Sequence, residues 1–295
     1  GEWNMKITIG TAQFGLDYGI SNKQGQVNGL QASKILEYAY RNGINFIDTA
    51  ASYGNSEEVI GSRISNQDWK IITKTISFQD DQITNRDTNK LKKYFNNSLK
   101  KLKKESIYGL LIHSCDDLFK PGGDKLFKEI ENIRSSGCVE KIGVSVYNNN
   151  QIDRLLSEYD FDLVQLPISI LDHRLIESGA LEKIKDTGAE IHARSVFLQG
   201  ILLMPLDVVP SYFLPIRKKL ESLKNISQEL NMSALELAFG FVNSISEIDK
   251  IIVGLNTVEQ LFEIINAAQI QVKYSDFSEL AVDNEDIVNP SLWRL

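Results

Sequence analysis

Four polar residues close or follow apolar runs of the sequence, and their types suit proton transfer. Asp48 ends the run FID, and Tyr53 follows it on a loop; Lys74 and His113 end two later runs. A lysine buried at such a position needs an acidic partner to keep its charge, and we expect Asp48 to be that partner. An ammonium group beside a phenol lowers a pKa that is otherwise about 10, so Tyr53 would become a usable acid.

Together, these residues could protonate a carbonyl oxygen while a hydride reaches its carbon. Tyr53 would donate the proton, a contribution worth roughly 10²–10⁴-fold in rate, and His113 would orient the substrate oxygen with a hydrogen bond. Taken singly, Asp48 and Lys74 would more often form a structural ion pair, and His113 would be a core histidine. Their occurrence together at strand ends favours catalysis.

These residues would meet only in a fold that gathers the ends of its strands. Eight short apolar runs alternate with stretches of helical periodicity, the pattern of a (β/α)₈ TIM barrel in the α/β class. A doubly wound sheet is the main alternative, but GTAQFG, from Gly10, lacks the glycine spacing of a dinucleotide-binding turn. The runs are KITIG from Lys6, NFIDT from Asn45, KIITK from Lys70, YGLLIH from Tyr108, KIGVSV from Lys141, DLVQLP from Asp162, EIHARS from Glu190 and KIIVGL from Lys250.

Periodicity also predicts which side chains these elements bury. Residues two apart share a face of a strand, so Phe46, Ile72 and Leu111 should lie beneath the polar strand ends. Helical spacing predicts an inward face for two helices, and the lysines of the second helix would then face solvent. The inward residues would be Leu30, Ile35, Leu36 and Ala39 in the first helix, which ends at Gly43, and Leu91, Tyr94, Phe95, Leu99 and Leu102 in the second, KLKKYFNNSLKKLKK.

Composition limits the partners and the compartment. The net charge of -7 argues against nucleic acid or an anionic membrane as a partner, and no run is long enough to cross a membrane. Cys115 and Cys138 have neither disulfide nor metal spacing, so we expect a cytoplasmic protein. Residues 1–4, which precede Met5, are expected to be a cloning remnant, and residues 5–295 a single barrel domain. The tail from Gln269, with Trp293, should dock on the barrel.

At these residues the sequence resembles the aldo-keto reductase family, from about Lys6 to Ala268. FIDTAASYGNSEEVIG, from Phe46, matches the family's signature, and GTAQFG, IITKT from Ile71 and LLIHS from Leu110 stand in register with it. The resemblance implies NADPH as the cofactor, with NADH as the alternative, no metal, a small-molecule carbonyl substrate and a monomer. The catalytic residues it implies are Asp48, Tyr53, Lys74 and His113.

The resemblance also implies a cofactor site in the second half of the chain. Ser145 and Gln165 match groups that hold the nicotinamide carboxamide, and Arg194 stands where an aromatic ring usually stacks on the nicotinamide. SVFLQG, from Ser195, matches the loop around the pyrophosphate, and VGLNTVEQLFEII, from Val253, matches the adenosine segment. The cofactor-binding residues implied are Ser145, Gln165, Arg194, Ser195, Phe197, Leu198, Gly200, Gly254, Asn256, Gln260 and Glu263.

Departures from the family pattern bear on the choice of ligands. Asn256 and Gln260 lie where many members read the cofactor's 2′-phosphate with Arg or Lys, which weakens the case for NADPH over NADH. Ser114 replaces a Trp that often follows the catalytic His and so predicts a more polar substrate pocket. Phe14 and Tyr18 are expected to line that pocket from the loop after the first strand.

The expected function is reduction of an aldehyde or ketone, with a sugar-derived carbonyl as one option, although these residues could also run the reaction in the oxidative direction. The alternative is a nicotinamide-binding regulatory or scaffold subunit with little turnover, because the same barrel occurs in regulatory proteins of potassium channels. The histidines lack metal-ligand spacing. His192 is expected to make a core hydrogen bond, and His173 to lie solvated in a loop.

Overall fold

The strands close into a parallel eight-stranded barrel in chain order, from β1 to β8 and back to β1. The computed structural model describes residues 5–19, 22 and 25–295, so the expectation for residues 1–4 lies outside it. This closure confirms the TIM barrel and excludes the doubly wound sheet. The strands are β1 Ile7–Gly10, β2 Phe46–Asp48, β3 Lys70–Lys74, β4 Ile107–Ile112, β5 Val139–Ser145, β6 Leu163–Pro167, β7 Glu190–Arg194 and β8 Lys250–Gly254.

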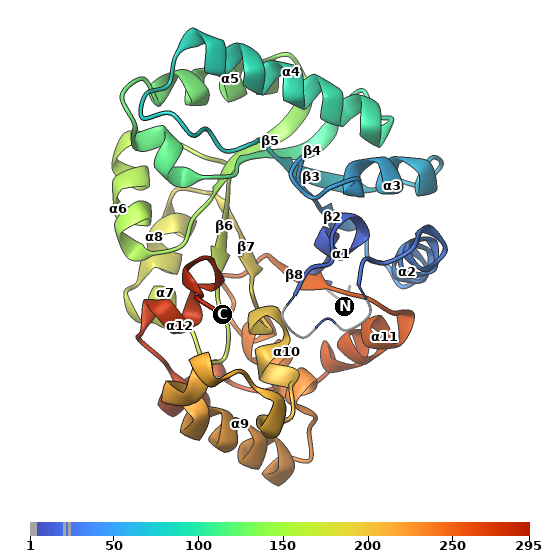
Figure 1. Ribbon diagram of the computed structural model, residues 1–295, viewed down its shortest axis with the longest axis vertical. Coiled ribbons are helices and arrows are strands. Elements are labelled where there is room, and N and C mark those ends of the chain that lie inside the picture. Colours follow the sequence, from blue (N-terminus) through green and yellow to red (C-terminus); the bar gives the residue numbers. More distant parts are fainter. Residues whose placement is uncertain (1–4, 20–21, 23–24) are drawn as a thin grey trace.

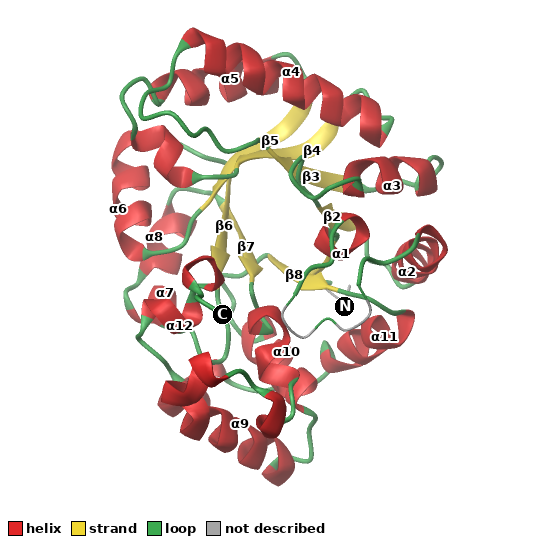
Figure 2. Ribbon diagram, viewed as in Figure 1, coloured by secondary structure: helices red, strands yellow, loops and turns green. Residues whose placement is uncertain are grey.

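Helices surround the barrel on its outside, as Figures 1 and 2 show. The long crossover after β7 carries two of them, α9 and α10. The helices are α1 Ala12–Gly15, α2 Gly29–Arg41, α3 Ser56–Arg63, α4 Asn85–Leu102, α5 Asp124–Ser135, α6 Asn149–Glu158, α7 Arg174–Glu177, α8 Ala180–Asp186, α9 Arg217–Glu229, α10 Ala234–Asn243, α11 Val258–Ala267 and α12 Glu285–Val288.

The inward faces of two helices match the prediction except at one residue in each. In α2, Ile35, Leu36 and Ala39 are buried, but Leu30 is 65% exposed because the helical repeat of about 3.6 residues puts it on the opposite side of the helix. In α4 the core residues Leu91, Phe95 and Leu102 are buried, whereas Tyr94 is exposed. The predictions for Leu30 and Tyr94 were therefore wrong.

The interior of the barrel is polar at the carboxyl ends of the strands and apolar in the layer before them. Phe46, Ile72, Leu111 and Leu163 form a separate buried cluster inside the sheet. Since Phe46 and Ile72 stand two residues before Asp48 and Lys74, the alternation predicted from sequence is confirmed. The apolar layer forms the base on which the polar strand ends rest.

The environments of two histidines, His192 and His173, were predicted from the sequence. His192 is fully buried, and its Nε2 lies 3.1 Å from a carboxylate oxygen of Glu190, in agreement with a core hydrogen bond. The prediction that His173 is solvated in a loop is wrong. Its ring is buried, stacks on Phe241 at a centroid distance of 4.8 Å and places Nε2 2.7 Å from the Ile170 carbonyl oxygen. The loop that carries His173 is packed beneath α10 rather than open to solvent.

The C-terminal tail docks on the barrel as expected. The Trp293 indole nitrogen donates a hydrogen bond to the Ile287 carbonyl oxygen at 2.8 Å, and its ring meets Phe213 edge-on at a centroid distance of 4.8 Å. Among the described residues, none of the helices is long and apolar enough to cross a membrane.

Candidate active site

A cavity of about 350 Å³ opens at the carboxyl ends of the strands. Parallel strands in a closed barrel bring these ends to one mouth, so side chains from distant parts of the sequence meet there. Most of the residues predicted for the site line this cavity. They are Tyr18, Asp48, Tyr53, Lys74, His113, Ser145, Gln165, Arg194, Ser195, Phe197, Gly200, Gly254, Asn256 and Gln260.

A buried ion pair lies at the centre of the cavity floor. The Lys74 ammonium donates to an Asp48 carboxylate oxygen at 2.5 Å and to the Thr49 carbonyl oxygen at 3.0 Å. Burial alone would lower the pKa of Lys74, but the Asp48 carboxylate and Tyr53 oppose that effect and raise it. Lys74 is therefore held as an ammonium group beside the phenol.

Gln165 completes this centre in a way that the sequence did not predict. Its amide nitrogen donates to the second Asp48 carboxylate oxygen at 2.7 Å, and the side chain is buried. Both Asp48 oxygens thus have a partner, one charged and one neutral. Gln165 was expected to hold a cofactor carboxamide, and that role remains a prediction; its observed contact fixes the carboxylate.

Tyr53 reaches over the ion pair and faces His113. The Lys74 ammonium lies 5.2 Å from the centroid of the Tyr53 ring, and the Tyr53 and His113 rings meet edge-on at 6.4 Å. The phenol, the ammonium group and the imidazole thus converge on one space at the mouth. This is the arrangement that a proton donor, a charge modifier and an orienting group require.

The loop that carries Tyr53 is locked against the loop after β1. A Cβ atom on Gly15 would lie 1.7 Å from the Tyr53 carbonyl oxygen, and one on Gly54, whose φ is +54°, would lie 2.2 Å from the Gly15 carbonyl oxygen. Glycine is thus required on both sides of the contact. Ser56 adds a hydroxyl hydrogen bond to the Thr11 carbonyl oxygen at 3.0 Å.

We predict that Gly15→Ala lowers turnover by on the order of 10²-fold, because the added methyl group pushes the Tyr53 backbone out of place and misplaces the phenol. Gly137→Ala is the control, since a Cβ at Gly137 would meet nothing within 4 Å; its φ of +84°, which Gly15 does not share, makes it a stringent one. Steady-state kinetics on both variants measures the effect. Equal activity in the two variants would show that the contact does not position Tyr53.

His113 is neutral at physiological pH. Burial, with the charges of Lys74 and Arg194, lowers the pKa of its imidazole from 6.5 to about 4. Its Nδ1 lies 3.5 Å from the Ser52 hydroxyl oxygen, and its backbone N–H donates to the Thr75 hydroxyl oxygen at 3.4 Å. A neutral imidazole can donate one hydrogen bond to a substrate oxygen without competing with Tyr53 as a strong acid.

The lowered pKa of His113 predicts a pH-dependent stability. The unfolded chain binds the proton near pH 6.5 and the folded chain only near pH 4, so stability falls as pH decreases through this window, by at most about 3 kcal/mol. We expect the urea unfolding free energy of His113→Gln to decline less between pH 7 and pH 4.5 than that of the parent protein. Parallel declines in both proteins would contradict this assignment.

Arg194 and Tyr147 form the wall opposite Tyr53. The Arg194 guanidinium carbon lies 4.2 Å from the centroid of the Tyr147 ring, and Nη2 donates to the Val146 carbonyl oxygen at 2.7 Å. Tyr147 was not predicted from the sequence to be a site residue. Its position two residues after Ser145 is the signal that could have found it, because alternation puts both side chains on the inner face.

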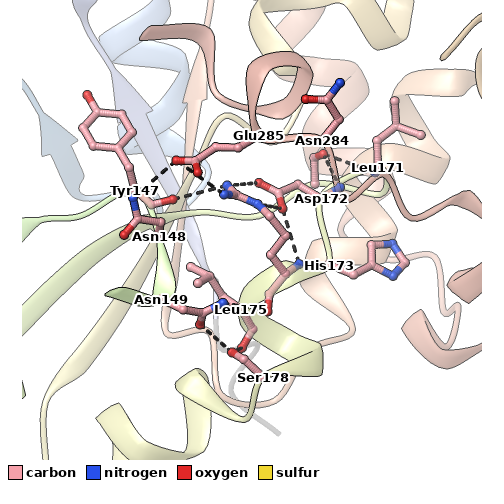
Figure 3. Close-up of polar contacts among 12 residues, drawn as sticks. Tyr147, Asn148, Asn149, Leu171, Asp172, His173, Leu175, Ser178, Asn284 and Glu285 are labelled. Atoms are coloured by element: carbon pink, nitrogen blue, oxygen red, sulfur yellow. Dashed lines mark hydrogen bonds and ion pairs between the residues drawn. The ribbon is translucent and has the colours of Figure 1, made fainter. Parts of the chain in front are cut away.

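A polar network that includes Glu285 of the C-terminal tail holds the backbone at Tyr147, as Figure 3 shows. Arg174 donates to the Tyr147 carbonyl oxygen at 3.2 Å and pairs with Asp172 at 2.8 Å. Glu285 of α12 lies 3.8 Å from the Arg174 guanidinium and accepts a hydrogen bond from Asn148 at 3.3 Å. The Tyr147 ring points away from this network, so α12 anchors the cavity wall without entering the cavity.

The loop after β7 has an unusual backbone. Ser195, Leu198, Gln199 and Gly200 all have positive φ values, between 50° and 92°. Successive backbone N–H groups in such conformations form concavities that suit anions. The implied role of this loop at a pyrophosphate is compatible with its shape, although Leu198 itself is buried beneath the cavity rather than lining it.

At β8, the Gln260 side chain accepts hydrogen bonds from the backbone N–H groups of Asn256 and Thr257, at 2.7 and 3.3 Å, and so caps α11. The side-chain oxygen of Asn256 is buried without a partner among the described residues, as is that of Gln13. Both residues line the cavity. Because buried polar atoms are normally satisfied, these unpartnered oxygens fit a polar ligand such as a nicotinamide cofactor.

Three predicted residues lie away from the cavity. Phe14, a residue of α1, is fully buried in the core, and Glu263 is exposed on the outer face of α11. Ser114 precedes a 3₁₀ turn at Cys115–Phe119 and does not line the cavity. Polar residues from the first loop and the loop after β7 line it instead. They are Gln13, Asn22 and Gln199.

Glu57 is a further polar residue whose structural role was not predicted from the sequence. Its carboxylate is buried in the first turn of α3 and accepts hydrogen bonds from the hydroxyl groups of Thr73 and Ser98, at 2.8 and 3.0 Å. It ties the start of α3 to β3 and α4, directly after the Tyr53 loop. The signal was its acidic type within an otherwise packed helix.

Comparison with known proteins decides the family. The aldo/keto reductase family model matches residues 6–282. The chain belongs to the aldo-keto reductase family. An aldo-keto reductase is an oxidoreductase. This one is 24% identical over 303 residues to YrpG, an uncharacterized oxidoreductase of Bacillus subtilis (strain 168). The match covers 90% of this chain and 88% of that protein. It is 28% identical over 183 residues to the glyoxal reductase of the same strain, covering 60% of this chain and 62% of that protein.

Solved structures of aldo-keto reductases share the fold. The aldo-keto reductase AKR11C1 from Bacillus halodurans, in its holo form, superposes with a TM-score of 0.76 at 18% identity, over 95% of this chain and 94% of that chain. The glycerol dehydrogenase AKR11B4 from Gluconobacter oxydans gives a TM-score of 0.71 at 19% identity, over 95% and 91%. At such identities the likeness concerns the barrel alone.

The described residues of this aldo-keto reductase contain no group of three His, Cys, Asp or Glu side chains that could hold a metal ion. Its two cysteines are free, and burial raises the pKa of the Cys115 thiol to about 12. A thiol of that kind is a poor nucleophile at neutral pH. The reactive groups at the mouth are thus the phenol, the ammonium group, the imidazole and the guanidinium.

Proposed function

We propose that this aldo-keto reductase reduces an aldehyde or ketone to an alcohol with NADPH or NADH, and that Tyr53 is the general acid. The observation that carries the proposal is the buried Lys74–Asp48 pair, at 2.5 Å, beneath a phenol that shares the cavity mouth with a neutral His113. The Tyr147 phenol also lies beside a positive charge, that of Arg194, but among the described residues that guanidinium has no carboxylate partner, whereas Asp48 fixes the Lys74 ammonium beneath Tyr53.

The protein side of the reaction follows from this arrangement. The carbonyl oxygen binds between Tyr53 and His113, which donates a hydrogen bond to it. Tyr53 passes its proton to that oxygen as negative charge develops, and the Lys74 ammonium stabilises the phenolate that remains. Asp48 and Gln165 keep the ammonium group in place. A bound NADPH or NADH would supply the hydride that the carbonyl carbon accepts.

The residues that would hold the cofactor lie along the second half of the mouth. In this proposal Ser145 would hold the nicotinamide, the 195–200 loop the pyrophosphate, and Asn256 and Gln260, which follow β8, the adenosine end; all of them line the cavity. None of the cavity residues at β8 is an Arg or Lys, so the positive charge that would favour the 2′-phosphate of NADPH is missing there.

The substrate is proposed to be a small polar carbonyl compound. The amides of Gln13, Asn22 and Gln199 line the cavity together with two tyrosines, Tyr18 and Tyr147. Such a lining suits hydroxylated compounds, including sugar-derived carbonyls. The glyoxal reductase relative, whose name denotes a small dicarbonyl, is in keeping with this class.

The first test is a fluorescence titration with NADPH and, separately, NADH, followed by a screen of carbonyl compounds with the preferred cofactor. We expect saturable binding of at least one cofactor and turnover of small polar aldehydes or ketones. Absence of binding would refute the proposal. Tight binding without turnover on any carbonyl would contradict the reductase and support a cofactor-binding regulatory subunit.

A further inference from the structure

Arg194 gives the catalytic cavity a positive charge that no carboxylate of the described residues neutralises. Among the described cavity residues, Asp48, Lys74 and Arg194 are the ones that are charged at neutral pH. The first two form an ion pair with each other. The net charge of the lining is therefore that of the Arg194 guanidinium.

The contacts of Arg194 leave much of its hydrogen-bonding capacity unused. In the described part of the chain, Nη2 donates to the Val146 carbonyl oxygen, Nε is buried without a partner, and the group forms no ion pair. Other partly buried arginines here are paired, since Arg174 contacts Asp172 at 2.8 Å and Arg134 contacts Asp162 at 2.6 Å. A guanidinium in a cavity normally has such a partner.

The surroundings fix the orientation of the guanidinium. It stacks on Tyr147 at 4.2 Å, and α12 anchors the Tyr147 backbone through Arg174. A planar guanidinium held in this way can bind a carboxylate with two parallel hydrogen bonds. Arg194 is thus preorganised for an anion that the described part of the chain does not supply.

The position of Arg194 favours the substrate as the source of this anion. Arg194 and His113 line the same cavity, and the charge of Arg194 helps to lower the pKa of the His113 imidazole. The backbone N–H groups of the 195–200 loop offer a separate anion site, and Asn256 and Gln260 follow β8. A cofactor phosphate would have those groups available.

We propose that Arg194 is a specificity-determining residue, which binds a carboxylate carried by the substrate beside its reacting carbonyl group. The inference rests on the proposed function and narrows it to carboxylate-bearing aldehydes or ketones, such as oxo acids and sugar acids. The carboxylate pairs with Arg194 on the Tyr147 wall, and the carbonyl oxygen meets Tyr53 and His113 across the cavity.

The test compares matched substrates that differ in one carboxylate. 4-Oxobutanoate is paired with butanal, and D-glucuronate with D-glucose, and kcat/KM is measured for the parent protein, Arg194→Gln and Arg194→Lys. We expect the parent protein to prefer the anionic member by about 10- to 100-fold. Arg194→Gln should lower this ratio at least tenfold, mainly through KM, and Arg194→Lys should give an intermediate ratio. Arg41→Gln, which removes the same charge on the exposed face of α2, should leave the ratio unchanged.

Each other outcome overturns one of the two proposals. Turnover without a preference for the anionic member would refute the role of Arg194 and leave the reductase intact. An unchanged ratio in Arg194→Gln, with NADPH or NADH affinity weakened more than tenfold, would assign the anion to the cofactor. If no carbonyl is turned over, the reductase fails. Calorimetric binding of 4-hydroxybutanoate to the parent protein and to Arg194→Gln then still decides whether Arg194 binds a carboxylate.

Discussion

Tyr53→Phe is expected to abolish carbonyl reduction, with kcat lowered by at least about 10³-fold, while the affinity for the nicotinamide cofactor changes little. The variant keeps the ring that lies 5.2 Å from the Lys74 ammonium and removes only the hydroxyl group that carries the proton. A general acid contributes roughly 10²–10⁴-fold to a rate. Steady-state turnover, with cofactor affinity from fluorescence titration, measures both parts of the prediction.

Tyr94→Phe provides the matched control, because it removes the same hydroxyl group from an exposed position on α4. It should behave as the parent protein does. Full activity of Tyr53→Phe would show that another group donates the proton. A large loss of cofactor affinity in that variant would instead mean that the Tyr53 hydroxyl group serves binding.

Lys74→Met is expected to cost about 3–5 kcal/mol of unfolding free energy, together with nearly all turnover. The substitution leaves the Asp48 carboxylate buried without its charged partner, and removal of one member of a buried ion pair typically costs this much. The amide of Gln165 remains as a donor to one carboxylate oxygen but carries no charge. Urea unfolding at pH 7 measures the loss.

Two further variants separate the charge effect from the loss of the side chain. Asp48→Asn with Lys74→Met removes both charges and should recover part of the stability, because no uncompensated charge stays buried. Lys183→Met breaks a solvent-exposed pair with Asp153 and should cost less than about 1 kcal/mol. If Lys74→Met cost no more than Lys183→Met, the central pair would not contribute to folding.

The fold could be predicted because its signals are local. Strands of a parallel barrel are buried on both faces, so each appears as a short apolar run, and the residue that ends the run faces the mouth. This is why Asp48 and Lys74 could be placed together from sequence, with Phe46 and Ile72 beneath them. The structure places the strand boundaries within a residue or two of the apolar runs.

The unpredicted features depend on contacts between distant parts of the chain. The hydrogen bond from Gln165 to Asp48 joins residues 117 positions apart, and no local pattern signals it. His173 was expected to be solvated, but its ring is buried because Phe241 of α10, far along the chain, packs on it. Tyr147 lies two residues beyond Ser145, the last residue of β5, so the alternation rule points its ring to the cavity but does not fix that direction.

The hydrogen bond from Gln165 to Asp48 joins the two halves of the barrel. Three strands lie between β2 and β6 in either direction around the ring, so Gln165 reaches Asp48 across the mouth. The proposed proton machinery, Asp48, Tyr53, Lys74 and His113, belongs to the first four strands and their loops, whereas Arg194 and Tyr147 belong to the last four. The proposed proton transfer and the proposed recognition of a substrate carboxylate are thus encoded in separate, contiguous segments of the gene. Recombination or gradual substitution in the second segment can therefore change which carbonyl is accepted without disturbing proton transfer, provided that Gln165 is retained.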